Sequence, residues 1–434
     1  MEQVLRKGLA GDASRVSTTA NKEYIYTRFQ KGHELTMLEQ QIKQAAMEIA
    51  GDIIHLRRTL HTHPELSFQE YETSAFIKGE LDKMGIPWKA MAGTGILATI
   101  RGTQPSDRTI ALRADIDALP ITELNNVAYK SRIDGVMHAC GHDVHTASLL
   151  GTARILLSIR EHFGGTVKLL FQPGEEKLPG GAPMMIREGA LRDPVPAAII
   201  GQHAMPSIRS GKIGIRKGAM MASMDEIIVR VKGKGGHGAM PHQNVDPVAI
   251  ACQMVVGLQQ IISRIGNPII PSVLSFGKFI ANGSINVIPD EVYMEGTFRT
   301  IDEAWRAKAH EQMIKTATGI VEAFGATCEF TINKGYPALS NHEALTTDIE
   351  TFAVEYLGRE NIEYPDLWMA AEDFAYYGRE IDACFYLLGT DSAAGDKRNP
   401  LHNPRFDIEE NTLALSTGLM AWFAIRSLGY GRPS

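Results

Sequence analysis

The chain has 434 residues, more than one ordinary domain holds and enough for two or three. Hydrophobic residues make up 44% of it and charged residues 22%, which is typical of a soluble globular protein and excludes a disordered or fibrous one. Its 44 basic and 50 acidic side chains give a net charge of -6, without the basic excess of a general nucleic-acid binder, so no nucleic-acid partner is expected.

The sequence shows no sign of export or of membrane insertion. No uninterrupted apolar run approaches the roughly 18 residues of a spanning helix, and no apolar segment of a secretory signal stands at the N-terminus. The 4 cysteines are widely scattered and form no disulfide framework. We therefore expect a cytoplasmic, enzyme-sized protein with no membrane partner.

The first 36 residues differ from the rest of the chain. They are polar, lack helical periodicity and precede a second methionine, Met37. Residues 1–36 are therefore predicted to be a polar N-terminal extension, or a segment upstream of the natural start. From Met37 to Leu60, apolar residues recur at three- and four-residue steps, which predicts helix.

An α/β pattern follows, in which short apolar runs alternate with a helical stretch. Such alternation predicts a largely buried sheet with helices on both faces. The predicted strands cover residues 95–100, 109–113, 167–172 and 197–200, and the helix covers 142–160.

The pattern changes near residue 216 and returns near residue 335. Between these points the predicted order is βαββαβ, the ferredoxin-like α+β arrangement. The corresponding ranges are 225–232, 246–265, 272–280, 287–299, 302–323 and 326–333, and α/β character resumes with a strand over 384–388 and a helix from 409. The prediction is thus an α/β catalytic domain over 37–216 and 335–434, with a second domain inserted over 217–334.

The strongest local motif is Met137-His-Ala-Cys-Gly-His-Asp-Val-His145. Cys140 and His142 lie two residues apart around a glycine, so a tight turn can direct a thiolate and an imidazole to one point, and both bind zinc or a similar divalent ion. A His-rich loop with a buried structural cysteine explains the same nine residues equally well.

A pair of carboxylates, Glu175 and Glu176, directly follows an apolar strand. The carboxyl ends of strands are where α/β sheets place their ligands. One carboxylate can bind a metal ion while its neighbour takes a proton from the attacking water. Taken alone, the pair is more commonly a solvated acidic turn.

Two further histidines occupy comparable positions. His203 follows the strand over 197–200, and His402 lies in the loop before the last helix. Each of them alone indicates only a capping or surface residue. Together the four motifs bring ligand-type residues to strand ends and loops of a single domain.

These ordered motifs resemble the zinc-dependent amidohydrolases and exopeptidases that include aminoacylase, carboxypeptidase G and succinyl-diaminopimelate desuccinylase. Within that family they are most similar to the branch of hippurate hydrolase, indole-acetyl-amino-acid hydrolase and N-acetyl-diaminopimelate deacetylase. The resemblance runs from about His61 to the final helix. It also includes Ala111-Leu-Arg-Ala-Asp-Ile-Asp-Ala-Leu-Pro120, Gly235-Gly-His-Gly238, Asn286-Val-Ile-Pro289, Ala371-Glu-Asp-Phe374 and Leu401-His-Asn-Pro404.

The resemblance implies a catalytic domain like that of the zinc exopeptidases, with two divalent metal ions. Zinc is the expected metal because a soft thiolate suits it, with manganese, nickel or cobalt as alternatives. Glu175 would be the general base, and Asp115 and Asp117, where this branch departs from the wider family, would lie behind the ligands. The implied ligands are Cys140, His142, Glu176, His203 and His402.

The resemblance also implies roles for residues outside the metal ligands. His237 would stabilise the oxyanion, often from the partner subunit, although a glycine-rich hairpin with an incidental histidine is the simpler interpretation. Asn286 and Arg299 would bind substrate, the arginine through its free carboxylate; otherwise Arg299 is a surface residue on a strand. Glu372 and Asp373 would buttress the site. The inserted domain would act as lid and dimerisation platform, so we expect a homodimer.

The resulting hypothesis is a metal-dependent amidohydrolase that cleaves N-acyl amino acids of acetyl, benzoyl or indole-acetyl type into a carboxylic acid and a free amino acid. One alternative is a dipeptidase or carboxypeptidase of the same family. The other is a non-catalytic relative that binds a metal or a peptide.

Overall fold

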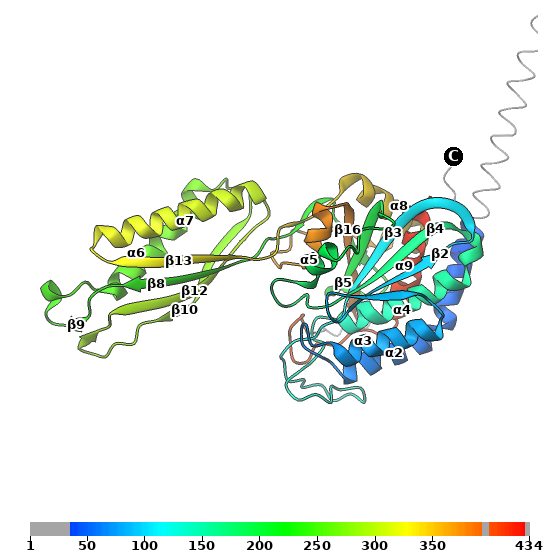
Figure 1. Ribbon diagram of the computed structural model, residues 1–434, viewed down its shortest axis with the longest axis horizontal. Helices are drawn as coiled ribbons and strands as arrows, with labels where there is room; N and C mark the ends of the chain where they lie inside the picture. Colours follow the sequence, from blue (N-terminus) through cyan, green and yellow to red (C-terminus); the bar gives the residue numbers. More distant parts are fainter. Residues whose placement is uncertain (1–34, 393–398, 430–434) are drawn as a thin grey trace, which may run out of the picture.

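The computed structural model describes residues 35–392 and 399–429, which form a larger and a smaller unit (Figure 1). Most of the extension predicted over residues 1–36 lies outside these residues. Its last two residues already belong to a helix over residues 35–48. The helical periodicity predicted from Met37 continues, after a turn, into helix α2 (Ala50–Thr62).

The larger unit is built on a mixed sheet of 8 strands in the order β1-β2-β4-β3-β5-β16-β6-β15. The four strands in its centre, β4, β3, β5 and β16, run parallel to one another. Their bounds, in sheet order, are β1 (Trp88–Met91), β2 (Gly95–Arg101), β4 (Gly164–Gln172), β3 (Gln104–Asp115), β5 (Ala198–Arg209), β16 (Asp382–Asp391), β6 (Ile213–Gly214) and β15 (Ile362–Glu363).

Helices cover both faces of this sheet, which confirms the predicted α/β class. The main hydrophobic core lies on one face, where helix α4 packs between the sheet, α2 and α9. Among the described residues, the other face is covered by the short helix α5 and the 3-10 helix η5, with side chains from two short strands beside them. The remaining bounds are α3 (Tyr71–Lys83), α4 (His142–Ser158), α5 (Gly181–Arg187), α8 (Glu343–Leu357), α9 (Thr412–Ser427), η1 (Arg160–His162), η4 (Arg359–Asn361) and η5 (Asp373–Arg379).

The parallel register brings the polar ends of three strands to one edge. Asp115, the last residue of β3, lies opposite Gln172, the last residue of β4. On the other side of β3, Arg113 pairs with Gly201 of β5, two residues before His203. The loop after β4 carries Glu175. Because carboxyl ends of parallel strands share an edge, these side chains converge there.

The smaller unit has the predicted βαββαβ order, with an antiparallel sheet in the order β10-β12-β8-β13. Its helices cover one face and form a separate core. The bounds are β8 (Asp225–Lys232), α6 (Pro247–Gln260) with the π-helical turn η3 (Ile261–Ile265), β10 (Ser272–Ile280), β12 (Glu291–Thr300), α7 (Glu303–Ala323) and β13 (Thr327–Lys334). One difference concerns residues 287–299, predicted as a single strand. A break at Pro289, which has no amide hydrogen to donate, divides them into β11 (Val287–Ile288) and β12.

Two small two-stranded sheets complete the fold. Strand β11 pairs with β9 (Gly236–His237) at the end of the smaller unit that lies away from the larger one (Figure 1). Strand β7 (Gly218–Met221) pairs with β14 (Leu339–Asn341) beside the larger unit. The domain boundaries at 216/217 and 334/335 stay a prediction.

One helical segment is apolar and exposed. Although no uninterrupted apolar run is long, the helix over Pro247–Ile265 is long and apolar enough to cross a membrane by length and composition, with mean hydropathy 1.5 and 28% of it buried. It begins at Asp246, whose carboxylate accepts a hydrogen bond from the amide of Val248, and at a proline in the first turn. One of its faces packs on the sheet of the smaller unit, and its other face is open.

Candidate metal centre

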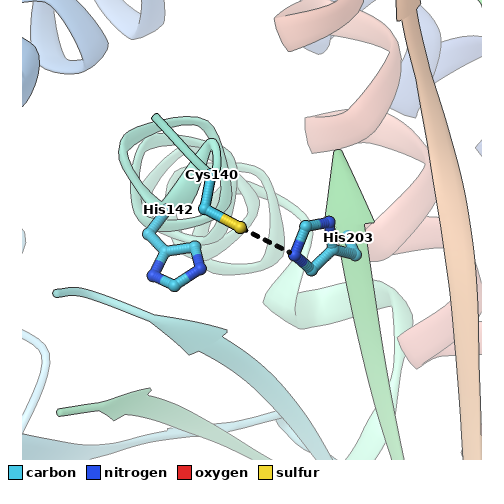
Figure 2. Close-up of side chains that lie close together, drawn as sticks. All are labelled: Cys140, His142 and His203. Atoms are coloured by element: carbon cyan, nitrogen blue, oxygen red, sulfur yellow. Dashed lines mark hydrogen bonds between the residues drawn. The ribbon is translucent and has the colours of Figure 1, made fainter. Parts of the chain in front are cut away.

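A glycine turn at the start of α4 directs two potential ligands to the same point. Gly141 has φ 87°, and a Cβ there would lie 2.7 Å from the Cβ of Ala204, so only glycine fits. Cys140 and His142 flank this turn, and both are buried. Figure 2 shows the thiol pointing towards His203 from β5, with the ring of His142 beside it.

Cys140 lies at the centre of a ring of donor atoms. Its Sγ is 3.4 Å from Nε2 of His203 and 3.2 Å from Nε2 of His402. Nε2 of His402 is also 3.2 Å from Oε1 of Glu176. The loop carrying His402 is fixed here because its amide donates to the carbonyl oxygen of Ala139. The structure therefore brings together all five ligand candidates, the fifth being His142, whose Nε2 is 4.0 Å from Oε1 of Glu176.

Hydrogen bonds on the far side of two rings leave one nitrogen of each facing this centre. Nδ1 of His142 is 3.1 Å from a carboxylate oxygen of Asp117. Nδ1 of His203 is 2.8 Å from the carbonyl oxygen of Ala204, to which it donates. Metal-binding histidines are oriented in this way, with the other nitrogen held by a carboxylate or a carbonyl. Asp117 also accepts hydrogen bonds from Ser67 and from the amide of Glu176, so it fixes two ligand candidates.

A second cluster of charges lies directly behind the first. Arg113 is fully buried and donates to Asp115 at 2.5 Å, to Glu372 at 2.9 Å and to Asp373 at 2.8 Å. Asp373 also accepts from Gln172 and from the amide of Ala182. Oε1 of Glu175, the predicted base, lies 3.4 Å from the amide of Asp373. One arginine therefore faces three carboxylates, with Glu175 and Glu176 close by.

The excess of negative charge changes the pKa values of the site. Burial raises the pKa of Glu175 well above its usual range, and repulsion from Glu372 and Glu176 raises it further. Burial raises the pKa of the Cys140 thiol, and repulsion from Glu176 and Glu175 raises it further. Burial lowers the pKa of His142, but Asp115 and Asp117 outweigh it and bring that pKa to about 10. Each of these shifts favours added positive charge at the centre.

Two observations indicate that divalent metal ions fit this site. Nε2 of His142 and Oε1 of Glu176 are buried polar atoms without a hydrogen bond among the described residues, although Oε1 has the 3.2 Å contact with His402, and each residue shares a group of potential ligand atoms with Cys140. Thiolate, imidazole and carboxylate are the ligands that zinc prefers. Three groups of potential ligand atoms overlap here: Cys140, His142 and His203; Cys140, Glu176 and His402; and His142, Glu175 and Glu176.

Asp115 and His145 also lie within reach of His142, but both are already occupied. Nδ1 of His145 is 2.6 Å from Asp115, and its Nε2 accepts from the amide of Ala204. Asp115 additionally accepts from Arg113. The geometry favours a supporting position for this pair behind the ligand candidates.

Three predicted residues are not brought to this centre within one chain. His237 on β9 and Asn286 lie together, because the amide of Gly238 donates to the carbonyl oxygen of Asn286. Both lie at the outer end of the smaller unit (Figure 1). Arg299 lies near the other end of β12, close to the connecting segments, where its Nε donates to Thr297.

Sequence reasoning assigned no role to two residues that support the centre. Arg113 lies within the fully buried half of β3, and a charged residue in an otherwise largely apolar strand was the available signal. The hydroxyl of Tyr336 donates to the carbonyl oxygen of Glu175 at 2.5 Å. Its position after a glycine in a connecting segment gave no signal.

The fold and this centre agree with the comparisons with known proteins. The sequence model of Peptidase family M20/M25/M40 matches residues 111–424. The chain is 45% identical over 308 residues to an N-acyl-L-amino acid amidohydrolase of Geobacillus stearothermophilus, covering 71% of this chain and 82% of that protein. It is 39% identical over 395 residues to an N-acetyl-L-cysteine deacetylase of Bacillus subtilis (strain 168), covering 91% and 92%.

Among solved structures, the Bacillus subtilis YXEP protein, a dinuclear metal binding peptidase from the M20 family, superposes with a TM-score of 0.76. It is 36% identical, and the match covers 88% of this chain and 99% of that one. The chain belongs to Peptidase family M20/M25/M40. It is a hydrolase acting on amide bonds, of metallopeptidase type.

Proposed function

We propose that the protein hydrolyses N-acyl amino acids to a carboxylic acid and a free amino acid, with two divalent metal ions, zinc in the first place, held by Cys140, His142, Glu176, His203 and His402. The observation that carries the proposal is the pair Glu175 and Glu176 in one loop. Glu176 lies beside Cys140 and His402. Glu175 is buried, and its Oε1 lies near the amide of Asp373, next to Glu372. Relatives named N-acyl-L-amino acid amidohydrolase and N-acetyl-L-cysteine deacetylase support the same reaction.

Amide hydrolysis needs an activated water, a polarised carbonyl and a proton for the leaving nitrogen. When bound, divalent metal ions lower the pKa of water and polarise the carbonyl oxygen. Glu175 takes the proton from the attacking water and returns it to the amine nitrogen. Without metal ions, burial and repulsion from Glu372 and Glu176 raise the pKa of Glu175, so this carboxyl group lies where a proton is readily held. Tyr336 and the amide of Asp373 hold it in place.

The experiment is the release of free amino acid from acetyl, benzoyl and indole-acetyl conjugates, and from several dipeptides, with chelated and metal-reconstituted protein. Metal-dependent release from N-acyl amino acids supports the proposal. Release from dipeptides alone favours the dipeptidase or carboxypeptidase alternative. No release at any metal loading, although metal binds, favours a non-catalytic relative.

We further propose that the protein acts as a homodimer through the smaller unit. Strand β10 is an edge strand, and exposed apolar side chains lie on it, on the neighbouring α6 and in the segment between them. It includes Val256, 69% exposed, and Ile269, 82% exposed, together with Phe279 and Ile280. Apolar surface of this kind on a soluble unit marks an interaction site. A second copy would also bring His237 to a metal centre that its own chain does not bring it to.

The local bonding of His237 suits a donor to an oxyanion. Its Nδ1 accepts a hydrogen bond from the amide of Ala239, so in the neutral ring the proton resides on Nε2. The ring is exposed and can enter a partner's site. One such donor is worth about 10²–10³-fold in kcat.

Mixed dimers test this arrangement. We expect His237→Ala and Glu175→Gln homodimers to be nearly inactive, and a mixture of the two, after subunit exchange, to recover activity, because one site of each mixed dimer has both residues intact. Val256→Asp should lower recovery by weakening the dimer, with Val195→Asp, exposed on the larger unit, as the control. An active His237→Ala dimer, or a mixture no better than its components, would contradict the arrangement.

A further inference from the structure

A cavity adjoins the metal centre. It has a volume of about 540 Å³, and its walls include Met205, Pro206, Trp368 and Leu401. A volume of this size is within the usual range of small-molecule sites, roughly 300–1,000 Å³. It is much larger than an acetyl group requires.

The cavity shares its wall with two of the ligand candidates. Met205 lies two residues after His203 on β5, and Leu401 immediately precedes His402. The ring of Trp368 meets the ring of His203 edge-on, with 5.6 Å between centroids and an interplanar angle of 80°. A group bonded to a carbonyl carbon at the centre would therefore reach this cavity directly.

The tryptophan is held in place by its backbone. Its amide donates to the carbonyl oxygen of Met220 at 3.0 Å, and its own carbonyl oxygen accepts from the amide of Ala222 at 3.1 Å. Both partners belong to or follow β7, whose last two side chains, Met220 and Met221, are buried in the core. The indole ring thus presents a fixed, half-buried aromatic surface, which favours contact with another ring.

The charge of the walls distinguishes the two ends of the substrate. The described wall residues are apolar or neutral apart from Asp391, and none of them is basic. A carboxylate entering here would lose its hydration without meeting a basic side chain among the described wall residues. The described lining therefore favours the neutral acyl end of an N-acyl amino acid over its free carboxylate. Arg299 of the smaller unit remains available for the carboxylate.

We propose that this cavity binds the acyl group of the substrate and selects an aromatic acyl group, of benzoyl or indole-acetyl type, over acetyl. The inference rests on the proposed function. It assigns to Trp368 and its neighbours the choice of acyl group, and to the smaller unit the recognition of the amino acid.

The test compares kcat/KM for benzoyl, indole-acetyl and acetyl conjugates of a single amino acid in metal-reconstituted dimer. We expect the aromatic conjugates to be preferred. Trp368→Ala should lower the ratio of aromatic to acetyl kcat/KM by about 10-fold or more, since a single methylene in such a pocket is already worth about 10–200-fold. Ser207→Trp, which fills the cavity from its exposed wall, should lower the same ratio without touching His203.

Trp88→Ala, an exposed tryptophan on β1, is the matched control and should leave the ratio unchanged. Metal content measured in each variant shows whether the centre is intact. A wild-type preference for acetyl, or ratios unmoved in both cavity variants, overturns the inference while the proposed function stands. A series with one acyl group and varied amino acids, if its ranking changes in Trp368→Ala, assigns the cavity to the amino-acid side chain instead. No release from any N-acyl amino acid overturns both.

Discussion

Arg306 in the smaller unit and Arg113 in the larger unit are both buried, and each organises a cluster of carboxylates, but the two clusters differ in charge balance. Arg306 donates to both oxygens of Asp225, at 3.0 and 2.6 Å, and to Glu303 at 2.9 Å. It also donates to the carbonyl oxygens of Met224 and Gly335, so it fastens the two segments that connect the units. Asp225 receives a further contact from His310 at 2.6 Å.

Arg113 has the opposite surroundings. It faces Asp115, Glu372 and Asp373, and the same region contains Glu175 and Glu176. In the smaller unit, burial raises the pKa of Asp225 but His310 and Arg306 outweigh it, so that pKa is lowered. In the larger unit, burial and repulsion raise the pKa values of Glu175 and Glu372. Charge balance thus distinguishes a cluster that joins the connecting segments from one that has an excess of buried carboxylates.

The largest expected effect tests the unbalanced cluster. Glu175→Gln removes the proposed base while keeping the shape of the side chain, and we expect turnover of N-acyl amino acids to fall by about 10²–10⁴-fold. Metal content should remain, because none of the five proposed ligands is changed. Glu303→Gln, in the balanced cluster, should retain turnover. Unchanged turnover in Glu175→Gln would refute the mechanism.

Disruption of the cluster around Arg306 should lower the stability of the folded protein. Arg306→Met leaves Asp225 buried without its main partner, so we expect the free energy of unfolding to fall by about 3–5 kcal/mol. Urea unfolding followed by circular dichroism measures the change. Adding Asp225→Asn to this variant should restore part of the loss, because the unpaired charge is then removed. A loss below about 1 kcal/mol would mean that the cluster does not fasten the connecting segments.

The smallest effect is a difference in pH dependence. In metal-free protein the pKa of Asp373 is raised to about 6 and that of Glu372 to about 8, for both mainly through burial. Folded pKa values above the unfolded ones mean that the folded state binds more protons, so stability is lost as pH rises towards 8. We expect the Tm of chelated protein to fall between about pH 6.5 and 8, and that of metal-loaded protein to fall less. Equal slopes would contradict the charge imbalance. Asp225, with its lowered pKa, loses its contribution on the acid side instead.

Much of the fold could be predicted from the sequence because each unit follows a simple period. The ferredoxin-like order of strands and helices emerged from alternation and helical spacing, and β8 and β10 have the predicted bounds. Short strands such as β7 and β14 could not be predicted, since three or four residues carry no period.

The ligand candidates could be predicted because they occur in compact motifs at strand ends. Cys140 and His142 share one turn, and Glu175 and Glu176 share one loop. The roles of Arg113 and Trp368 could not be predicted, because the residues that they contact come from distant segments of the chain. Arg113 donates to Glu372, and the ring of Trp368 contacts the ring of His203. The distance of His237 from the centre of its own chain depends on how the two units are arranged, which no local pattern encodes.

The backbone at His402 has a consequence for how the centre holds together. This residue has φ 63°, in the left-handed region that side chains other than glycine rarely adopt. Such a conformation costs on the order of 1 kcal/mol or more and persists only where neighbours enforce it, here through the hydrogen bond to Ala139. The backbone of this loop is therefore strained, and binding of a metal ion by His402 would offset the free-energy cost of the strain. Loss of the metal would leave this segment, more than the buried turn at Gly141, free to relax, so demetallation should begin at His402.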